Sequence, residues 1–206
     1  MKNPNIKILN QLNDNYSYII YNSENYEAII IDPAESLSHI NYLRKNNLFL
    51  KYILITHHHE DHTSGIKGLI EQFPKTEIFA PIQIKQYKIN LVKEETIIRS
   101  NINDFIVYET PGHTLDHVVF YDRKNKILFS GDTLFRLGCG RVFEGTYNQM
   151  FNSLEKISRL EDETTVYCGH EYTKTNLKFL KSIFGNEKEI NKLENEINTE
   201  IKNTGR

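Results

Sequence analysis

The sequence lacks tryptophan and holds only two cysteines, Cys139 and Cys168, among its 206 residues. It therefore lacks the paired, regularly spaced cysteines of a small disulfide-stabilised secreted domain. It also contains no apolar run that approaches the ~20 residues needed to span a bilayer. The N-terminal residues show no hydrophobic stretch typical of a secretion signal. These absences favour a cytoplasmic protein with reduced thiols.

The sequence also lacks a large excess of either positive or negative charge. The chain has 25 Lys and Arg residues against 27 Asp and Glu residues, which leaves a formal net charge of −2. Nucleic-acid-binding domains usually carry a basic surplus, so we expect neither nucleic acid nor a membrane surface as the partner. The length suits a single domain with a substantial core, and our default expectation is a monomer that acts on a small molecule.

Short β-rich runs and helical patterns alternate along the chain. This order fits two mixed sheets packed together with helices on both outer faces, a four-layer αββα sandwich of the α/β (α+β) class. We divide the chain into this domain, residues 1–172, and a C-terminal helical segment, residues 173–206. The predicted strands are 6–12, 16–21, 28–31, 52–55, 77–80, 96–99, 102–109, 117–121, 127–130 and 165–168. The predicted helices begin at Ser36 or Ser38 and run to about 46, and then cover 63–73, 148–160, 176–184 and 188–202.

The most informative motif is His57-x-His59-x-Asp61-His62, which directly follows a buried strand. His57 and His59 are two residues apart, so at a strand end they share a face. Asp61 and His62 come after the chain turns and can face a second metal ion. Imidazole and carboxylate groups together are the ligands that zinc, iron and manganese accept. The motif therefore predicts a metal site.

Three further candidates, His113, Asp132 and His170, also follow predicted strands, and a glycine precedes each of them. A glycine lets the backbone turn sharply where a strand ends. A single Gly-His pair is weak support for a metal ligand, but four such places at successive strand ends favour one shared metal centre.

With these motifs, the sequence resembles the glyoxalase II (hydroxyacylglutathione hydrolase) family of the metallo-β-lactamase superfamily. The resemblance extends from near the N-terminus to Thr173 and covers most of the chain. The segments that carry it are 12–18, 31–34, 56–62, 111–114, 130–135, 138–141, 143–146 and 169–173.

The resemblance implies a role for each candidate residue. His57, His59 and His113 would hold the first metal ion, Asp61, His62 and His170 the second, and Asp132 would bridge the two. Zinc is the expected metal, and iron or manganese would suit the same ligands. Arg141, Phe143 and Tyr172 would bind the glutathione part of the substrate. Family members usually continue beyond Gly205-Arg206, so we expect the helical segment to be shorter than theirs.

The implied reaction is hydrolysis of S-(2-hydroxyacyl)glutathione thioesters, with S-D-lactoylglutathione as the usual substrate, in the detoxification of methylglyoxal. Two metal ions roughly 3.5–4 Å apart share a water molecule and lower its pKa toward about 7. The resulting hydroxide attacks the thioester, while Asp61 and Asp132 serve as the catalytic carboxylates. No Ser or Cys nucleophile is required. His58 and Glu60 are expected to point away from the metals, and His39 is expected to be solvated on a helix.

Other functions remain open from the sequence. A persulfide dioxygenase needs a single iron on two histidines and one carboxylate. A β-lactamase or a nuclease of the same superfamily would differ in substrate, and neither a secretion signal nor a basic excess supports them. A non-catalytic metal-binding protein would keep the ligands without turnover.

Overall fold

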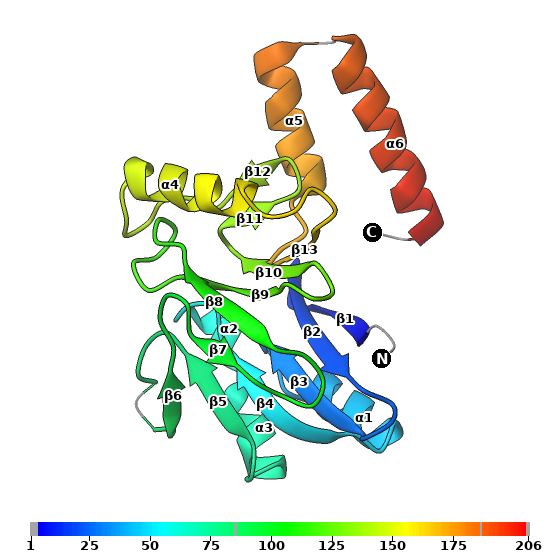
Figure 1. Cartoon of the computed structure of the whole chain (residues 1–206). Coiled ribbons are helices and arrows are strands. Elements are labelled where there is room, and N and C mark those ends of the chain that lie inside the picture. Colours follow the sequence, from blue (N-terminus) through cyan, green and yellow to red (C-terminus); the bar gives the residue numbers. More distant parts are fainter. Residues whose placement is uncertain (1–3, 85, 186, 205–206) are drawn as a thin grey trace.

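Two β-sheets pack face to face in the computed structural model, which describes residues 4–84, 86–185 and 187–204 (Figure 1). The first sheet has the strand order β1-β2-β3-β4-β5-β6 and the second has the order β13-β10-β9-β8-β7. The first sheet contains β1 (Asn5–Gln11), β2 (Asn15–Tyr21), β3 (Glu27–Ile31), β4 (Phe49–Leu54), β5 (Glu77–Ala80) and β6 (Ile89–Leu91). The second contains β7 (Ile97–Ile98), β8 (Phe105–Glu109), β9 (Val118–Asp122), β10 (Ile127–Gly131) and β13 (Thr165–Cys168).

Helices cover the outer faces of both sheets. α1 (Leu37–Lys45) and α3 (Ile66–Gln72) pack on the first sheet, and α4 (Tyr147–Ser158) packs on the second. α4 begins with a capping box, in which the Thr146 and Gln149 side chains satisfy backbone N–H groups at the helix start. The predicted four-layer αββα arrangement is confirmed.

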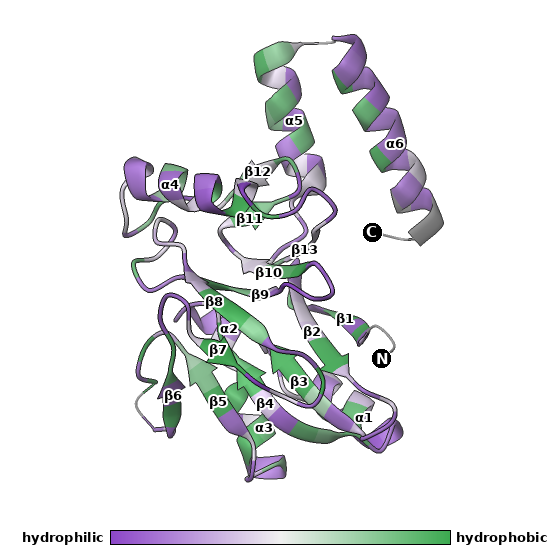
Figure 2. Ribbon diagram, in the orientation of Figure 1, coloured by the Kyte–Doolittle hydropathy of each residue, from purple (hydrophilic) through white to green (hydrophobic). Residues whose placement is uncertain are grey.

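β3 shows how the sequence specifies these layers. Its run Ala28–Ile31 is fully buried and apolar, as expected of a strand covered on both faces. Side chains alternate between faces along a strand. Ile29 and Ile31 accordingly join the core between the sheets, whereas Ala28 and Ile30 join the core beneath α1 and α3. The green strands of Figure 2 mark the same apolar runs.

Strand direction places the motifs at one edge of the sandwich. β3, β4 and β5 are parallel to one another, and β10 is parallel to β13. The carboxyl ends of parallel strands lie at the same edge of a sheet, which is where open α/β sheets bind ligands. The segments that follow β4, β10 and β13, each of which carries candidate ligands, therefore lie close together.

Three details differ from the sequence prediction. The single helix predicted over 63–73 is divided into α2 (Glu60–Thr63) and α3, because the chain departs from helical hydrogen bonding at Gly65. The N–H of Gly65 bonds the carbonyl of Pro33 at 2.8 Å instead. Three short strands, β6, β11 (Leu134–Phe135) and β12 (Gly138–Cys139), were not predicted. The helix predicted to begin at residue 176 begins one turn earlier.

The C-terminal segment forms two helices, α5 (Thr173–Phe184) and α6 (Lys188–Thr204), which stand beside the sandwich (Figure 1). Lys181 of α5 pairs with Glu194 of α6 at 2.6 Å. The division of the chain at residue 172 stays a prediction. Parts of two expectations lie outside the described residues: residues 1–3 of the N-terminus, and Asn186 and Gly205-Arg206 of the helical segment. Among the described residues, no helix combines the length and hydrophobicity that crossing a membrane requires.

His39 is fully buried, and the expectation of a solvated position was wrong. It lies on the face of α1 that also buries Ile40 and Leu43 against the first sheet. Its Nδ1 lies 2.8 Å from the carbonyl oxygen of Glu35, and its Nε2 lies 2.8 Å from the hydroxyl of Ser17. Burial disfavours the charged imidazolium and lowers the pKa of His39 from 6.5 to about 4.

This lowered pKa predicts a loss of stability in mild acid. Between pH 6.5 and pH 4 the unfolded chain binds a proton at His39 and the folded protein does not, so the free energy of unfolding decreases as the pH falls. The full contribution is about 3 kcal/mol. We expect urea unfolding of His39→Gln to depend less on pH over this interval than unfolding of the wild type. The other histidines are common to both proteins, so equal pH slopes would contradict the prediction.

Candidate metal centre

The seven predicted ligands gather at one edge of the sandwich, although they come from four separate segments of the chain. His57 and His59 follow β4, and α2 supplies Asp61 and His62. The remaining three, His113, Asp132 and His170, lie in the loops that follow β8, β10 and β13. The donor atoms form three groups, and within each group they lie within 4.8 Å of one another: His57, His59 and His113; Asp61, His62 and His170; and His57, His62 and Asp132.

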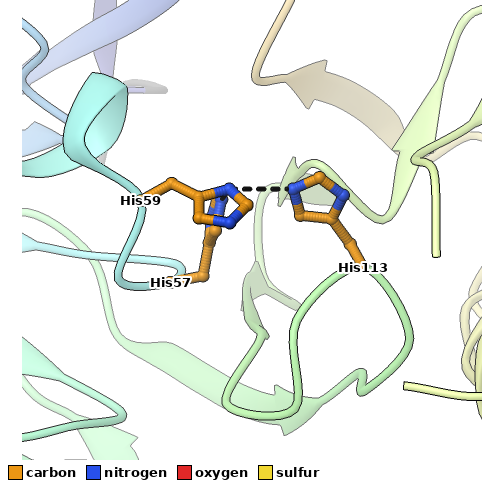
Figure 3. Close-up of side chains that lie close together, drawn as sticks. All are labelled: His57, His59 and His113. Carbon is orange, nitrogen blue, oxygen red and sulfur yellow. Dashed lines mark hydrogen bonds between the residues drawn. The ribbon is translucent and has the colours of Figure 1, made fainter. Parts of the chain in front are cut away.

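The first group consists of three imidazoles that face one another (Figure 3). Nε2 of His57 lies 3.0 Å from Nδ1 of His59, and Nε2 of His113 lies 3.1 Å from the same atom. Tetrahedral coordination with metal–nitrogen bonds of 2.0–2.1 Å separates ligand nitrogens by roughly 3.4 Å. These nitrogens are therefore close to the spacing that one metal ion requires.

The second group has a similar spacing. Nε2 of His62 lies 3.4 Å from Nε2 of His170, and Oδ2 of Asp61 lies 3.4 Å from Nε2 of His170. The same carboxylate oxygen lies 3.7 Å from Nε2 of His62. Two imidazoles and a carboxylate thus surround a second position.

Asp132 lies between the two groups. Its Oδ2 is 3.4 Å from Nε2 of His113 and 3.3 Å from Nε2 of His170, and its Oδ1 is 3.5 Å from Nε2 of His62. Oδ1 is buried and has no hydrogen-bond partner among the described residues. A buried unpaired carboxylate oxygen is costly. A divalent metal ion would satisfy it, so the residues present fit the metal site that the fold implies.

Four of the candidate ligand histidines are oriented by hydrogen bonds to their second ring nitrogen. The ring nitrogen that faces away from the cluster has a hydrogen-bond partner in each case, which fixes the tautomer and the ring orientation of a metal-binding histidine. The partners are Thr56 Oγ1 for His57 at 3.0 Å, Asp32 Oδ2 for His62 at 3.0 Å, Arg141 O for His113 at 2.8 Å and Asp14 Oδ1 for His170 at 2.8 Å.

The protonation of the cluster also suits metal binding. Burial strongly lowers the pKa of His57, and the neighbouring histidines lower it further, so its imidazole is neutral. Burial opposes ionisation of Asp132, but the hydrogen bond from His170 and the charge of His62 hold its pKa well below the usual range. Burial also disfavours a charged His62, yet its pairing with Asp32 raises its pKa to about 9. A metal ion that binds His62 therefore displaces a proton.

His117 lies next to Asp132 and supports its backbone. It is fully buried, and its Nε2 accepts the backbone N–H of Asp132 at 3.0 Å. Burial lowers its pKa to about 3, so it remains a neutral acceptor. Gly131 lies between these residues with a φ of 47°. A Cβ there would lie 2.8 Å from Nε2 of His117 and 2.7 Å from Oγ1 of Thr56, so only glycine fits.

His58 takes a different direction from its neighbours in the motif. Its Nδ1 lies 2.9 Å from Oδ1 of Asp116, and its Nε2 lies 3.2 Å from Oε1 of Glu144. His58, His59 and Glu144 also bring three donor atoms together at the rim of the site. Because both nitrogens of His58 already face carboxylates, we assign this group no metal ion.

The three residues predicted to bind glutathione border the cluster. The Tyr172 ring stacks on the His170 ring, with centroids 4.9 Å apart and an angle of 2° between the planes. The Phe143 ring lies edge-on to His113 at 5.2 Å and is 62% exposed. Arg141 contacts His113 through its backbone, and its side chain is exposed.

Neither cysteine has the character of a nucleophile. Burial raises the pKa of the Cys139 thiol, and it raises that of Cys168 to about 11. A nucleophilic cysteine usually has a lowered pKa, because the thiolate is the reactive form. Catalysis by a cysteine is therefore disfavoured here.

The sequence reasoning assigned no role to Asp14, Asn15 or Asp32, all of which contact ligands. Asp32 lies in a segment that carries the family resemblance, so a signal for it was present. Asp14 and Asn15 lie in another such segment, 12–18, but no local pattern shows which distant loop their turn will meet.

Comparisons with known proteins agree with this geometry. The family model described as "Metallo-beta-lactamase superfamily" matches residues 12–170. A hydroxyacylglutathione hydrolase of Pelagibacter ubique is 46% identical over 177 residues, which cover 84% of this chain and 74% of that protein. A hydroxyacylglutathione hydrolase of Bdellovibrio bacteriovorus is 41% identical over 184 residues, which cover 87% of this chain and 72% of that protein.

Solved structures share the fold. The BLEG-1 B3 metallo-β-lactamase superimposes with a TM-score of 0.73 at 26% identity, covering 81% of this chain and 91% of that one. ETHE1 from Myxococcus xanthus superimposes with a TM-score of 0.71 at 28% identity, covering 81% and 76%. The extent of the family match and the identity to these relatives show that the chain belongs to the metallo-β-lactamase superfamily and, within it, to the hydroxyacylglutathione hydrolase family.

Proposed function

We propose that this protein hydrolyses S-(2-hydroxyacyl)glutathione thioesters, with S-D-lactoylglutathione as the substrate, and releases D-lactate and glutathione in the detoxification of methylglyoxal. The observation that carries the proposal is the paired donor set bridged by Asp132, in a chain whose relatives are named hydroxyacylglutathione hydrolases. We further propose that the two positions hold zinc, because imidazole and carboxylate ligands at this spacing suit a tetrahedral zinc ion.

In the proposed reaction, bound metal ions would lower the pKa of a water molecule and polarise the thioester carbonyl. The protein's own residues orient the reactants. The Asp61 carboxylate, held by the side-chain amide of Asn15 at 2.9 Å, faces the cluster and would accept a hydrogen bond from the attacking water. Arg141, Phe143 and Tyr172 would hold the glutathione part beside the cluster. The leaving thiolate needs no acid, because a free thiol has a pKa of only about 8.5.

Thioester hydrolysis by the purified, metal-analysed protein tests the proposal. We expect the enzyme to decrease the thioester absorbance of S-D-lactoylglutathione. The absorbance should persist when a chelator has removed the metal ions from the enzyme, and it should decrease again when zinc is restored. Two parallel assays test other reactions of the superfamily. One measures hydrolysis of a chromogenic β-lactam, and the other measures oxygen uptake in the presence of glutathione persulfide. A protein that binds two metal ions but leaves the thioester intact would contradict the proposed function.

A further inference from the structure

The turn between β1 and β2 reaches the second group of ligands from the opposite sheet. Asn15, the first residue of β2, forms an isolated β-bridge with His170, which follows β13. The two segments belong to different sheets and lie side by side in Figure 1. The turn therefore joins the two sheets next to Asp61 and His170.

Two side chains of this turn contact ligands directly. Oδ1 of Asp14 lies 2.8 Å from Nδ1 of His170, and Nδ2 of Asn15 donates to Oδ2 of Asp61 at 2.9 Å. The same amide nitrogen lies 3.1 Å from the backbone carbonyl oxygen of Asp61. Asn15 is 5% exposed, so water does not readily replace its amide.

Backbone contacts hold the turn in place independently of these side chains. The N–H of Tyr16 donates to the carbonyl of Gly169 at 2.8 Å, and the N–H of Glu171 donates to the carbonyl of Asp14 at 2.9 Å. A substitution at Asp14 or Asn15 can therefore remove a contact to a ligand and leave the path of the chain unchanged.

The first group does not use this turn. The hydrogen-bond partners behind His57 and His113 are Thr56 and Arg141. The carboxylate of Asp14 fixes the hydrogen on Nδ1 of His170, which leaves the lone pair of Nε2 directed at the cluster. The amide nitrogen of Asn15 donates to the Asp61 carboxylate and so orients that ligand. The support is thus specific to one of the two positions.

We propose that Asp14 and Asn15 are positioning residues that set the affinity of the Asp61–His62–His170 position for a divalent metal ion, independently of the His57–His59–His113 position. The proposal rests on the two-metal site of the proposed function. Loss of a hydrogen-bond partner behind a metal ligand typically weakens binding 10–100-fold. In this protein the loss should affect one ion of the two.

The test is a zinc titration of the metal-free protein against a chromophoric chelator. We expect Asp14→Ala and Asn15→Ala to weaken binding of one zinc ion about 10–100-fold and to leave the other within about threefold of wild type. Asp14→Asn, which keeps an acceptor oxygen for His170, should restore part of the lost affinity. Asn13→Ala is the matched control, because Asn13 is an exposed residue of the same turn.

Cobalt titrations give an independent readout, since the visible absorption of the ion reports the ligands of each position. We expect the spectrum of the first equivalent to be unchanged in the variants and that of the second to develop only at higher cobalt concentration. Equal weakening of both ions, or two ions bound as in the wild type, would overturn the proposal. A wild-type protein that binds two ions but hydrolyses no thioester would refute the proposed function alone.

Discussion

Asp132→Asn is expected to lower thioester hydrolysis by on the order of 1,000-fold or more. Both carboxylate oxygens lie 3.3–3.5 Å from ligand nitrogens of the two groups, so this one residue serves both metal positions. The amide of the variant has the shape of the carboxylate but carries no charge. It also turns a donor toward the cluster, where a metal ion needs an acceptor.

Metal analysis and steady-state kinetics on the same preparation check this expectation. We expect fewer than two bound ions per chain in the variant. Asp122→Asn is the matched control, because Asp122 is also buried but accepts hydrogen bonds from Asn125 in a turn. It should retain both ions. Full activity of Asp132→Asn would show that Asp132 does not hold the metals.

Gly140→Ala is expected to disrupt the site through the backbone. A Cβ at Gly140 would overlap the carbonyl oxygen of Asp132 and would lie 3.2 Å from Nδ1 of His113. The neighbouring carbonyl of Arg141 holds that same nitrogen. The loop must therefore move away from both ligands. We expect about 3 kcal/mol of lost stability and a loss of activity on the order of 100-fold.

Gly138→Ala, two residues earlier in the same loop, provides the comparison. The three atoms nearest to its Cβ would all belong to the side-chain amide of Asn176, whose hydrogen bond to the carbonyl of Arg136 is worth about 1 kcal/mol. That side chain can rotate away, whereas the backbone of Asp132 cannot. Urea unfolding and thioester hydrolysis of both variants should therefore differ clearly. Similar stability and activity of the two variants would show that the close approach of Gly140 to the carbonyl of Asp132 is not required for the site.

Two neighbouring histidines of the motif, His57 and His58, face different partners. His57 and His58 are adjacent and chemically identical, yet His57 faces the other candidate ligands and His58 pairs with Asp116 and Glu144. The spacing of the motif separated the two correctly, because side chains on an extended chain alternate in direction. The partners of His58 come from loops far along the chain and could not be anticipated.

Local features of the sequence were sufficient for the layers of the fold and the clustering of the ligands. The alternation along β3 depends only on which side chains avoid water, and the histidines follow strands whose apolar runs are plain in the sequence. The two-residue spacing of His57 and His59 needs only the geometry of an extended chain. These properties depend on residues that are close together in the sequence, so they can be predicted from the sequence alone.

Tertiary contacts decided the rest. The helix predicted over 63–73 is interrupted because Gly65 bonds Pro33 of another segment, and His39 is buried because its face of α1 packs on the first sheet. The turn at Asp14 and Asn15 supports ligands that lie 46 and 156 residues away along the chain. Such contacts form only when the two sheets pack together. The sequence by itself therefore determined which residues could bind metal, and the packing of the sheets decided what holds those residues in position.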